Sequence, residues 1–314
     1  MFQSLIASDL FLVRRYLSVD HQVLGYDLRK ATSPIITEPA QDLTSILETN
    51  DEVNQLSFSS GRSGPLFLAV ADDSGYVRVS ETLYPSSSQG RRKLLHHNPE
   101  HSLVTCTAFH PKLNAELVSG GTDCSLKAWN MSKPHKPAHS LIISRDDQGA
   151  QICNPPMVHS VAWSPSGRWI VAGLGDGTLQ VTDKSLTPIC RLRDGHQGGV
   201  ASVCFCEFTV GGKVDVNDRI FASAGSDGNL FLWDLETDLA GKSAINPLAI
   251  SNSTLDLDIS SISLQSPPRL LFGIPHGSKV NWIASSRGQD PVFPSTLFVA
   301  DTTNDITAYT LPLR

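Results

Sequence analysis

The sequence predicts an all-β fold built from repeated units. Apolar residues alternate with other residues at 76–79, 179–181 and 230–232, and a period of two indicates strands. Turn sequences precede these strands: "DDSG" at 72–75, "GDG" at 175–177 and "SDG" at 226–228. Asp-Gly favours a hairpin turn, because both central positions need a positive φ. Long helical periodicity is nearly absent, so strands joined by turns are expected throughout.

The turns and strands recur at a regular interval. The residue five places beyond the turn glycine, or its equivalent, is Ser80, Trp129, Thr182 or Trp233, at intervals of 49, 53 and 51 residues. Tyr26 lies 54 residues before Ser80, and a last copy ends at Tyr309 after a longer gap of 76. A period of 40 to 55 residues made only of strands predicts a β-propeller, here a single domain over residues 1–314.

Each unit has a second recognisable strand upstream of its hairpin. These strands lie in 53–60, 104–111, 158–167, 200–205 and 279–285. A unit therefore reads as strand, turn, strand, Asp-Gly turn, strand and a weaker fourth strand, which is one propeller blade. Six blades are countable, with expected bounds of 1–40, 41–95, 96–150, 151–194, 195–268 and 269–314. Residues 131–157 are expected to be a connection, residues 236–269 to supply a fourth strand and a loop, and the last blade to end after its third strand.

Two units contain the same four residue types in the same order. They are His101, Ser119, Asp123 and Trp129 in one unit, and His196, Ser223, Asp227 and Trp233 in the other. On these residues the chain resembles the WD40-repeat family, in which the four types form a hydrogen-bonded tetrad inside a blade. Each of these side chains needs a polar partner once buried, and a closed network supplies all of them. The adjacent His96 and His97 are expected to be exposed.

Further motifs give a narrower resemblance. "ADDSG" at 71–75, "KPHK" at 133–136, "NPPMVHSVA" at 154–162, "HGSKVNW" at 276–282 and "LFVADTTNDITAY" at 297–309 are similar to the WD repeat-containing protein 53 family, from about residue 3 to the C-terminus. That family begins with a further blade, which implies a fold of seven blades and a start here on the second. Two interpretations stay open: a shortened product, or a six-blade ring that closes in another way.

The sequence "YDLR" at 26–29 is the most informative candidate site. Tyr26 and Asp27 align with Trp233 and Asp234, and Arg29 lies two residues beyond Asp27. Asp-x-Arg at this place resembles the motif with which WD40 proteins dock on the DNA-damage-binding adaptor of cullin-4 ubiquitin ligases. A guanidinium at the blade rim can make planar, multi-donor contacts with such a partner. The alternative is that Arg29 is a solvated residue at a strand end.

The composition and short motifs of the chain argue against several classes of binding partner. Nucleic-acid binding usually requires a basic surface, and a chain with a net charge of −6 shows none overall. The sequence contains no run of 18 apolar residues, so it predicts no membrane-spanning helix. The six cysteines form no CxxC pair and are expected to be reduced thiols of a cytoplasmic or nuclear protein. His135 and His139 could bind a metal on a helix, but Pro137 lies between them, so no metal site is expected. The glycine-rich "GLGDGT" at 173–178 is followed by a strand and not by the helix that a phosphate-binding loop needs, so no such loop is expected. The sequence therefore predicts no cofactor.

These observations favour protein binding over catalysis. A Ser–His–Asp set exists in each tetrad, but it is expected to be buried, and no GxSxG sequence occurs. The leading hypothesis is a scaffold that recruits substrates to a cullin-4 ubiquitin ligase through Asp27 and Arg29. The runner-up is a general assembly or chromatin-associated scaffold without a ligase role. A propeller hydrolase is a distant third.

Overall fold

In the computed structural model, the described residues form strands and turns. The structure describes residues 2–7, 14–19, 21–27, 49, 51–60, 66–81, 93–98, 102–145, 154–193, 195–206, 208–210, 213–215, 218–235, 268–286, 296–303 and 305–310. Within these ranges no helix is long and apolar enough to cross a membrane.

The first three sheets are antiparallel and follow the chain in order. The first has three strands, and the next two have four. Their strands are β1 (Phe2–Ala7), β2 (Arg14–Val19) and β3 (Gln22–Asp27); β4 (Val53–Phe58), β5 (Phe67–Asp72), β6 (Tyr76–Glu81) and β7 (Lys93–His96); β8 (Val104–Phe109), β9 (Glu116–Gly121), β10 (Ser125–Asn130) and β11 (His139–Ile142).

The remaining sheets repeat the pattern. The fourth and fifth have four strands and the last has three, with a small extra hairpin inserted in the fifth unit. The strands are β12 (Val158–Trp163), β13 (Trp169–Leu174), β14 (Leu179–Asp183) and β15 (Pro188–Leu192); β16 (Val200–Phe205), β19 (Ile220–Gly225), β20 (Asn229–Asp234) and β21 (Arg269–Pro275); β22 (Val280–Ser286), β23 (Thr296–Asp301) and β24 (Ile306–Thr310); and the hairpin β17 (Phe208–Val210) and β18 (Lys213–Asp215).

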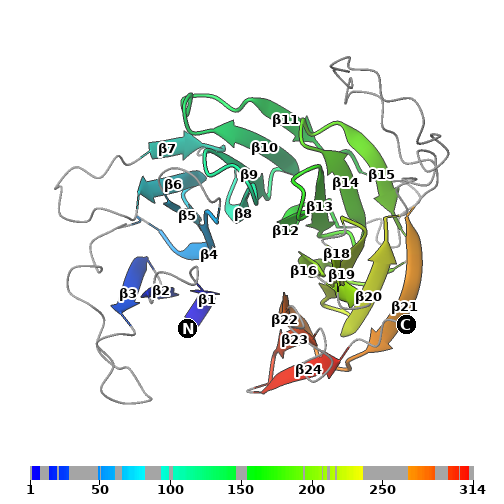
Figure 1. Cartoon of the computed structure of the whole chain (residues 1–314). Coiled ribbons are helices and arrows are strands. Elements are labelled where there is room, and N and C mark those ends of the chain that lie inside the picture. The colour runs from blue at the N-terminus through cyan, green and yellow to red at the C-terminus, as the bar shows by residue number, and fades with distance from the viewer. Residues whose placement is uncertain are drawn as a thin grey trace, which may run out of the picture.

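The six sheets stand side by side around a ring (Figure 1). The first strands of consecutive sheets, β4, β8, β12, β16 and β22, contact one another in turn on its inner side. The sheet β1–β3 and the sheet β22–β24 stand on the two sides of the open part of the ring (Figure 1). The prediction of an all-β propeller is confirmed.

Some predicted bounds are wrong. The strand β21 pairs with β20, with Trp233 opposite Leu270, so the fifth blade extends to Pro275 and not to residue 268. Apolar residues at 270–272 and 274 give β21 the contacts that a fourth strand needs. The expected connection 131–157 contains the fourth strand β11 of its blade. Most of the predicted fourth-strand segment, 236–267, lies outside the described residues.

The core lies between consecutive sheets. Each sheet turns small or aliphatic residues toward the first strand of the next: Ala222, Ala224 and Leu230 are fully buried against Val280 and its neighbours. Glycines permit the closest approach, since a Cβ on Gly173 would lie 2.7 Å from Val200 Cγ1. Burial of this apolar surface, at about 25 cal/mol per Å², is the main force that holds the sheets together.

Hydrogen bonds also set the register between inner strands. The third residue of one inner strand accepts a hydrogen bond from the fourth residue of the next. Gln55 Oε1 accepts from the Thr107 N–H at 2.8 Å, and Ser202 Oγ accepts from the Ile283 N–H at 3.2 Å. Ser160 Oγ accepts from the Val203 N–H in the same way. The side chain at this third position therefore points toward the next blade.

Candidate protein-interaction site

The fifth blade brings together the four predicted residues His196, Ser223, Asp227 and Trp233. Trp233 Nε1–H donates to Ser223 Oγ at 2.9 Å, and Ser223 Oγ lies 2.9 Å from His196 Nε2. His196 Nδ1 lies 3.1 Å from Asp227 Oδ1. The serine and histidine are fully buried, and the tryptophan is nearly so. The network joins the turn of the hairpin to its strands and to the chain segment that precedes the blade.

The third blade contains the same network with a different histidine. Trp129 Nε1–H donates to Ser119 Oγ at 2.8 Å, and His97 Nδ1 lies 2.8 Å from the same oxygen. His97 Nε2 lies 3.3 Å from Asp123 Oδ1. The assignment of His101 to this network is therefore corrected to His97, and His101 lies outside the described residues. The expectation that His97 is exposed is also wrong, since 2% of its surface is exposed.

Each network fixes the proton positions on its histidine. The ionised aspartate can only accept a hydrogen bond, so the ring nitrogen that faces it carries the proton and donates it. In the neutral ring the other nitrogen is then an acceptor and receives the proton of the serine hydroxyl, whose oxygen accepts from the indole N–H. The protonated nitrogen is thus Nε2 in His97 and Nδ1 in His196, which means that the two rings are turned relative to one another.

Glycine makes room for both histidine rings. A Cβ on Gly225 would lie 2.5 Å from His196 Nδ1, and one on Gly121 would lie 2.9 Å from His97 Nε2. Each glycine stands two residues before its aspartate and is the first of the five residues between the last paired positions of the two strands, here called the turn residues. The sequence Gly-x-Asp at this turn is therefore a requirement of the packed imidazole.

The other described turns hold a carboxylate with a different partner. In the second blade Asp72 Oδ2 accepts from Arg78 Nε at 2.9 Å. In the fourth blade Asp176 Oδ2 accepts from Arg191 at 2.5 Å. In the last blade His276 lies 2.8 Å from Asp301 Oδ2 and 2.7 Å from the Tyr309 hydroxyl. Sequence reasoning missed these three pairs. The feature that could have indicated them is an aspartate at the hairpin turn of a blade that lacks the complete tetrad.

Burial and hydrogen bonding shift the pKa values of these groups. The pKa of His97 is lowered from 6.5, because burial removes the solvent that would stabilise its charged form. The pKa values of the Asp123 and Asp227 carboxyl groups lie well below 3.8: burial alone would raise them, but hydrogen bonds from His97, Asn98 and Ser125, or from His196, outweigh it. The carboxylates are therefore ionised and act as fixed acceptors.

These networks have the chemistry of a structural clamp. Ser119 and Ser223 are fully buried, and each Oγ is occupied by an indole N–H and an imidazole. A catalytic serine instead needs an exposed Oγ beside an oxyanion site. Within the described ranges no group of three or more His, Cys, Asp or Glu residues is placed to hold a metal ion.

The predicted docking motif lies at the end of the first sheet. Asp27 is the last residue of β3, with Arg14 of β2 as its backbone partner, and Arg29 lies outside the described residues. The equivalent Asp234 of the fifth blade forms a bidentate ion pair with Arg219, at 2.5 and 2.6 Å. An aspartate at this position can thus anchor the strand end.

A pocket of about 490 Å³ lies where the hairpin turns and inner strands meet. Four consecutive sheets and the segments between them contribute to it. Its lining residues are Thr105, Asn154, His159, Gly175, Gly199, Ala201, Ser226, Lys279 and Asn281. Burial lowers the pKa of His159 from 6.5, which favours its neutral form. Lys279 supplies a positive charge, so the pocket suits an acidic or carbonyl-rich peptide segment.

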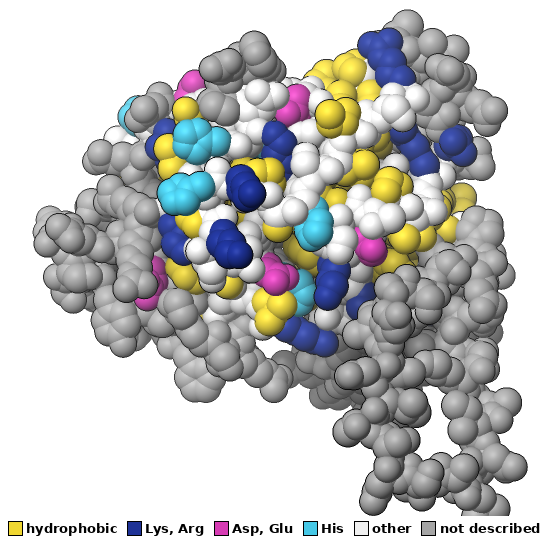
Figure 2. Space-filling model, turned by 90° about the horizontal axis from the view of Figure 1, so that it is seen from above, with side chains coloured by type: hydrophobic (Ala, Val, Ile, Leu, Met, Phe, Trp, Pro, Cys, Tyr) yellow, Lys and Arg dark blue, Asp and Glu magenta, His cyan; other side chains and the backbone are white. Residues whose placement is uncertain are grey.

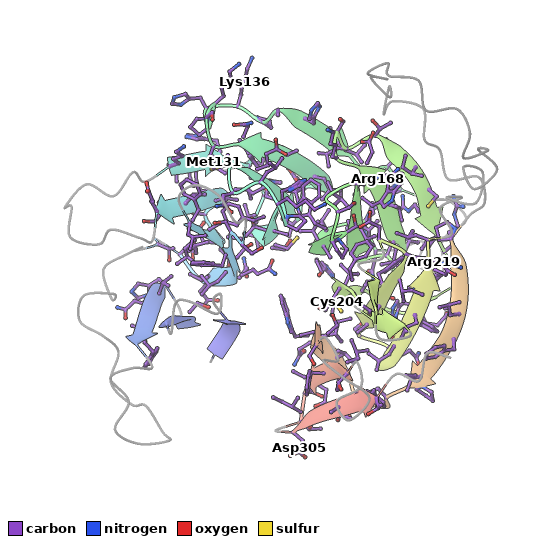
Figure 3. The ribbon with its side chains drawn as sticks, viewed as in Figure 1. Met131, Lys136, Arg168, Cys204, Arg219 and Asp305 are labelled. Carbon is purple, nitrogen blue, oxygen red and sulfur yellow. The ribbon has the colours of Figure 1, made fainter. Side chains whose placement is uncertain are left out.

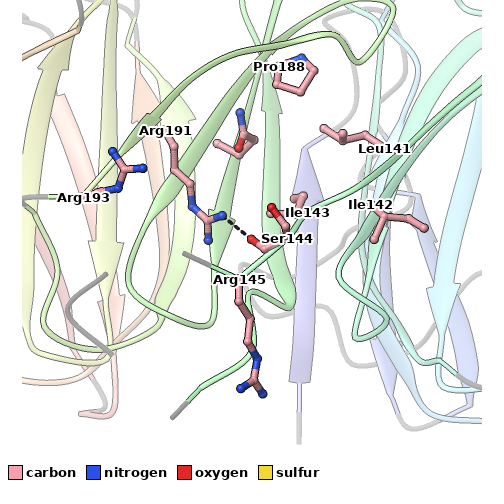
Figure 4. A pocket seen from close by; sticks show the side chains of 9 residues that line it. Leu141, Ile142, Ile143, Ser144, Arg145, Pro188, Arg191 and Arg193 are labelled. Atoms are coloured by element: carbon pink, nitrogen blue, oxygen red, sulfur yellow. Dashed lines mark hydrogen bonds between the residues drawn. The ribbon is translucent and has the colours of Figure 1, made fainter. Parts of the chain in front are cut away.

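A second pocket, of about 250 Å³, lies between the outer strands β11 and β15 (Figure 4). Arg191 lines this pocket and donates hydrogen bonds to the Ser144 carbonyl at 2.6 Å and to Asp176. Arg145 and Arg193 also line it, beside Ile142, which is 76% exposed. Figure 2 looks down on this side of the ring, where basic side chains lie among apolar ones.

The repeats match a known family model. The model "WD domain, G-beta repeat" matches residues 92–130, 151–183 and 187–234. The chain contains WD40 repeats. The first and third matches include the His97 and His196 networks, and the second covers the fourth blade, in which Asp176 pairs with Arg191 instead. WD40-repeat proteins are generally non-catalytic scaffolds.

Curated proteins and solved structures with WD40 repeats show what this chain is similar to. It is 24% identical to the WD repeat-containing protein 53 homolog of Dictyostelium discoideum, over 93% of this chain and 75% of the relative. It is 27% identical to the WD repeat-containing protein VIP3 of Arabidopsis thaliana, over 49% of this chain and 50% of that protein. A chain in the crystal structure of a mitotic checkpoint complex has the same fold, with a TM-score of 0.62, 16% identity and coverage of 96% of this chain and 71% of that one.

Proposed function

We propose that this WD40 propeller is a protein-binding scaffold that recruits substrates to a cullin-4 ubiquitin ligase. The observation that supports binding is the fixing of the hairpin turns. In five blades the turn carboxylate is hydrogen-bonded within its own blade: Asp72, Asp123, Asp176, Asp227 and Asp301. Turns held in this way form a preorganised surface, which lowers the entropy lost on binding.

The client site in this proposal is the pocket of about 490 Å³. Gly175 and Ser226 of the hairpin turns line it, together with Lys279. It would take an extended segment whose acidic side chain meets Lys279 and whose backbone meets Asn154 and Asn281. The working protein in this proposal acts in the cytoplasm or the nucleus, where its thiols stay reduced.

One relative supports the ligase role by its name. The chain is 23% identical to the "E3 ubiquitin-protein ligase COP1" of Arabidopsis thaliana, over 66% of this chain and 27% of that protein. It is 32% identical to a "Denticleless protein homolog" of Gallus gallus, over 24% of this chain and 10% of that protein. In this proposal the sequence "YDLR" at 26–29 supplies the adaptor contact through Asp27, the last residue of β3, and Arg29.

Changing Arg29 to Ala tests the adaptor contact. The tagged chain is purified from cells, and the adaptor that co-purifies with it is measured by quantitative mass spectrometry. We expect R29A to lower adaptor recovery by roughly tenfold or more, since arginine is a typical interface hot spot. The adjacent Lys30→Ala is the matched control and retains the adaptor. Equal recovery with R29A and the unchanged chain would show that the adaptor does not dock here.

A scaffold without a ligase role is the second candidate. The chain is 26% identical to the "Histone acetyltransferase type B subunit 2" of Eremothecium gossypii, over 54% of this chain and 35% of that protein. The same purification separates the two candidates. If stable partners are recovered with neither the adaptor nor a cullin among them, the assembly scaffold is correct and the ligase proposal fails.

A further inference from the structure

A basic pocket lies between the outer edges of the third and fourth blades. The strands β11 and β15 are the fourth strands of these blades and stand on the outer side of the ring (Figure 1). Lys136, three residues before β11, extends from the same outer edge (Figure 3). The pocket, of about 250 Å³, is lined by Arg145, Arg191 and Arg193. It lies away from the open part of the ring, between two complete four-stranded sheets.

Ser144 lines this pocket just beyond the last strand of the third blade. The residue before it, Ile143, is 5% exposed, and its N–H donates to the Cys124 carbonyl at 2.8 Å. The next two residues, Ser144 and Arg145, are exposed. The backbone of Ser144 is thus held in place by its neighbour, while its hydroxyl is accessible to a modifying enzyme.

One arginine is already fixed beside Ser144. Arg191 Nη1 donates to the Ser144 carbonyl at 2.6 Å (Figure 4). The same guanidinium donates to Thr178 Oγ1 at 2.9 Å and to Asp176, and its side chain is 11% exposed. Arg193, which is exposed, lies on the same side of Ser144 as Arg191 (Figure 4). An anion on the serine side chain would therefore meet one charge that is already positioned and a second that can turn toward it.

The charge of the pocket favours an anion. Of the described residues that line it, three are arginines and none carries a carboxylate. Asp176, the acidic residue beside Arg191, is already paired with that arginine. A phosphoserine carries about −1.5 to −2 charges at pH 7, and opposite an arginine cluster it forms about one to three charge-assisted hydrogen bonds. The pocket is therefore suited to a phosphate monoester on Ser144.

The sequence after Ser144 matches the preference of serine kinases that select acidic substrates, here called acidophilic kinases. Such kinases recognise a carboxylate three residues after the serine, and charge patterns of this kind give kinases their specificity. Asp146 and Asp147 stand at the second and third positions after Ser144, and both lie outside the described residues. This motif is independent of the pocket, since Arg191 and Arg193 come from the next blade.

We propose that Ser144 is a phosphorylation site and that Arg191 and Arg193 bind its phosphate, which fastens the outer edge of the third blade to that of the fourth. In the reaction the Ser144 hydroxyl oxygen forms a bond to the γ-phosphorus of a nucleoside triphosphate held by the kinase. The bond from this phosphorus to the bridging oxygen of the β-phosphate breaks, the nucleoside diphosphate leaves, and the catalytic aspartate of the kinase accepts the hydroxyl proton. The site goes beyond the proposed ligase role, since it uses neither Arg29 nor the client pocket.

Treating the purified chain with an acidophilic kinase and ATP tests the modification. Peptide mass spectrometry measures the phosphate on each serine. We expect phosphate on Ser144, and at least about tenfold slower modification when Asp147→Asn removes the carboxylate that the kinase recognises. Ser140 is the internal control: it is exposed on β11, but Ile143 stands three residues after it, so it should stay unmodified. An unmodified Ser144, or equal phosphate on Ser140, overturns the proposal.

A second experiment tests the arginine contacts without a kinase. Phosphoserine is incorporated at position 144 during protein synthesis, and the melting temperature is compared with that of the chain with serine. We expect the phosphate to raise the melting temperature by about 2 °C or more, and Arg193→Gln to remove this gain. Lys184→Gln is the matched control, because it removes an equal charge from an exposed position of the same blade outside the pocket; the gain should persist.

The titration of the phosphate, followed by ³¹P NMR, gives a measurement that a change in stability alone would not alter. Cations favour the dianion, so Arg193→Gln should raise the pKa of the phosphate, whereas Lys184→Gln should leave it unchanged. Far-UV circular dichroism checks that both variants keep their strand content, and the effect of the phosphate on the unchanged chain requires no variant. An unchanged melting temperature on phosphorylation, or the same phosphate pKa with and without Arg193, overturns the proposal.

Discussion

The hydroxyl oxygen of Ser119 forms hydrogen bonds with two buried side chains of the third blade. The substitution Ser119→Ala removes both hydrogen bonds. Trp129 Nε1 and His97 Nδ1 each lie 2.8 Å from this oxygen. All three residues are at most 2% exposed, so water does not replace the lost hydroxyl. The variant therefore leaves a buried indole N–H donor and a buried imidazole nitrogen without their partner.

The expected cost follows from these two groups. Leaving a buried polar group unsatisfied costs about 1–3 kcal/mol, and the small volume change from Ser to Ala adds little. Two such groups give a loss of about 3 kcal/mol in the free energy of unfolding, with partial relaxation of the ring included. Ser223→Ala in the fifth blade should cost a similar amount, since its two distances are 2.9 Å.

Equilibrium unfolding in urea, followed by tryptophan fluorescence and far-UV circular dichroism, measures this loss. Ser140→Ala is the control: Ser140 lies exposed on β11, and its substitution should change the free energy by less than about 0.5 kcal/mol. Trp129→Phe removes the indole donor, so combining it with Ser119→Ala should cost less than the sum of the two. Additive losses, or a Ser119→Ala loss below about 0.5 kcal/mol, would refute the network as the source of this stability.

Three further predictions concern titratable groups. The pKa of His97 is lowered from 6.5 in the folded chain, so the unfolded chain takes up a proton first and the free energy of unfolding should fall as the pH drops below 6.5. The low pKa values of Asp123 and Asp227 stabilise the fold above pH 3.8, so the free energy of unfolding should fall a second time as the pH drops toward and below this value. Melting temperatures measured from about pH 7.5 to about pH 3 check both losses. A melting temperature that does not change with pH contradicts them. Burial raises the pKa of the Cys106 and Cys190 thiols to about 12, so at about pH 8 they should react with a disulfide reagent only after unfolding; mass spectrometry of the native chain shows whether they stay unlabelled.

The hairpin residues of each tetrad could be predicted because their spacing is local. Ser, Asp and Trp lie on two strands and one turn of fixed length, so their separations repeat between Ser119–Trp129 and Ser223–Trp233. The histidine comes from the segment before the blade, whose length varies. His97 lies 22 residues before its serine, and His196 lies 27 before its own. Spacing alone therefore could not decide between His97 and His101.

The sequence could not place the fourth strand of the fifth blade, because that strand lies far from its hairpin. In the fifth blade, 34 residues separate the end of β20 at Asp234 from the start of β21 at Arg269. The segment between them contains the alternating sequence "LDLDISSISL" at 255–264, which also has a strand pattern. Pairing with β20 decides the matter: Leu230 stands opposite Ile274 and Leu232 opposite Phe272. A sequence pattern indicates that a strand can form, but the partner determines which one does.

The five turn carboxylates show that these blades require a hydrogen-bond donor at the turn and not a particular residue type. Where the aspartate is the third turn residue, as in Asp123 and Asp227, a histidine reaches it across a glycine. Asp176 has the same place but takes Arg191 from the fourth strand, and Leu174 stands in place of the glycine. Asp72 and Asp301 are the first turn residues, where the glycine would be, and the third residue, Ser74 or Thr303, donates its backbone N–H to them. Blades that lack the full tetrad are thus held by the same electrostatics, and their sequence differences are alternative ways to satisfy one buried or partly buried anion.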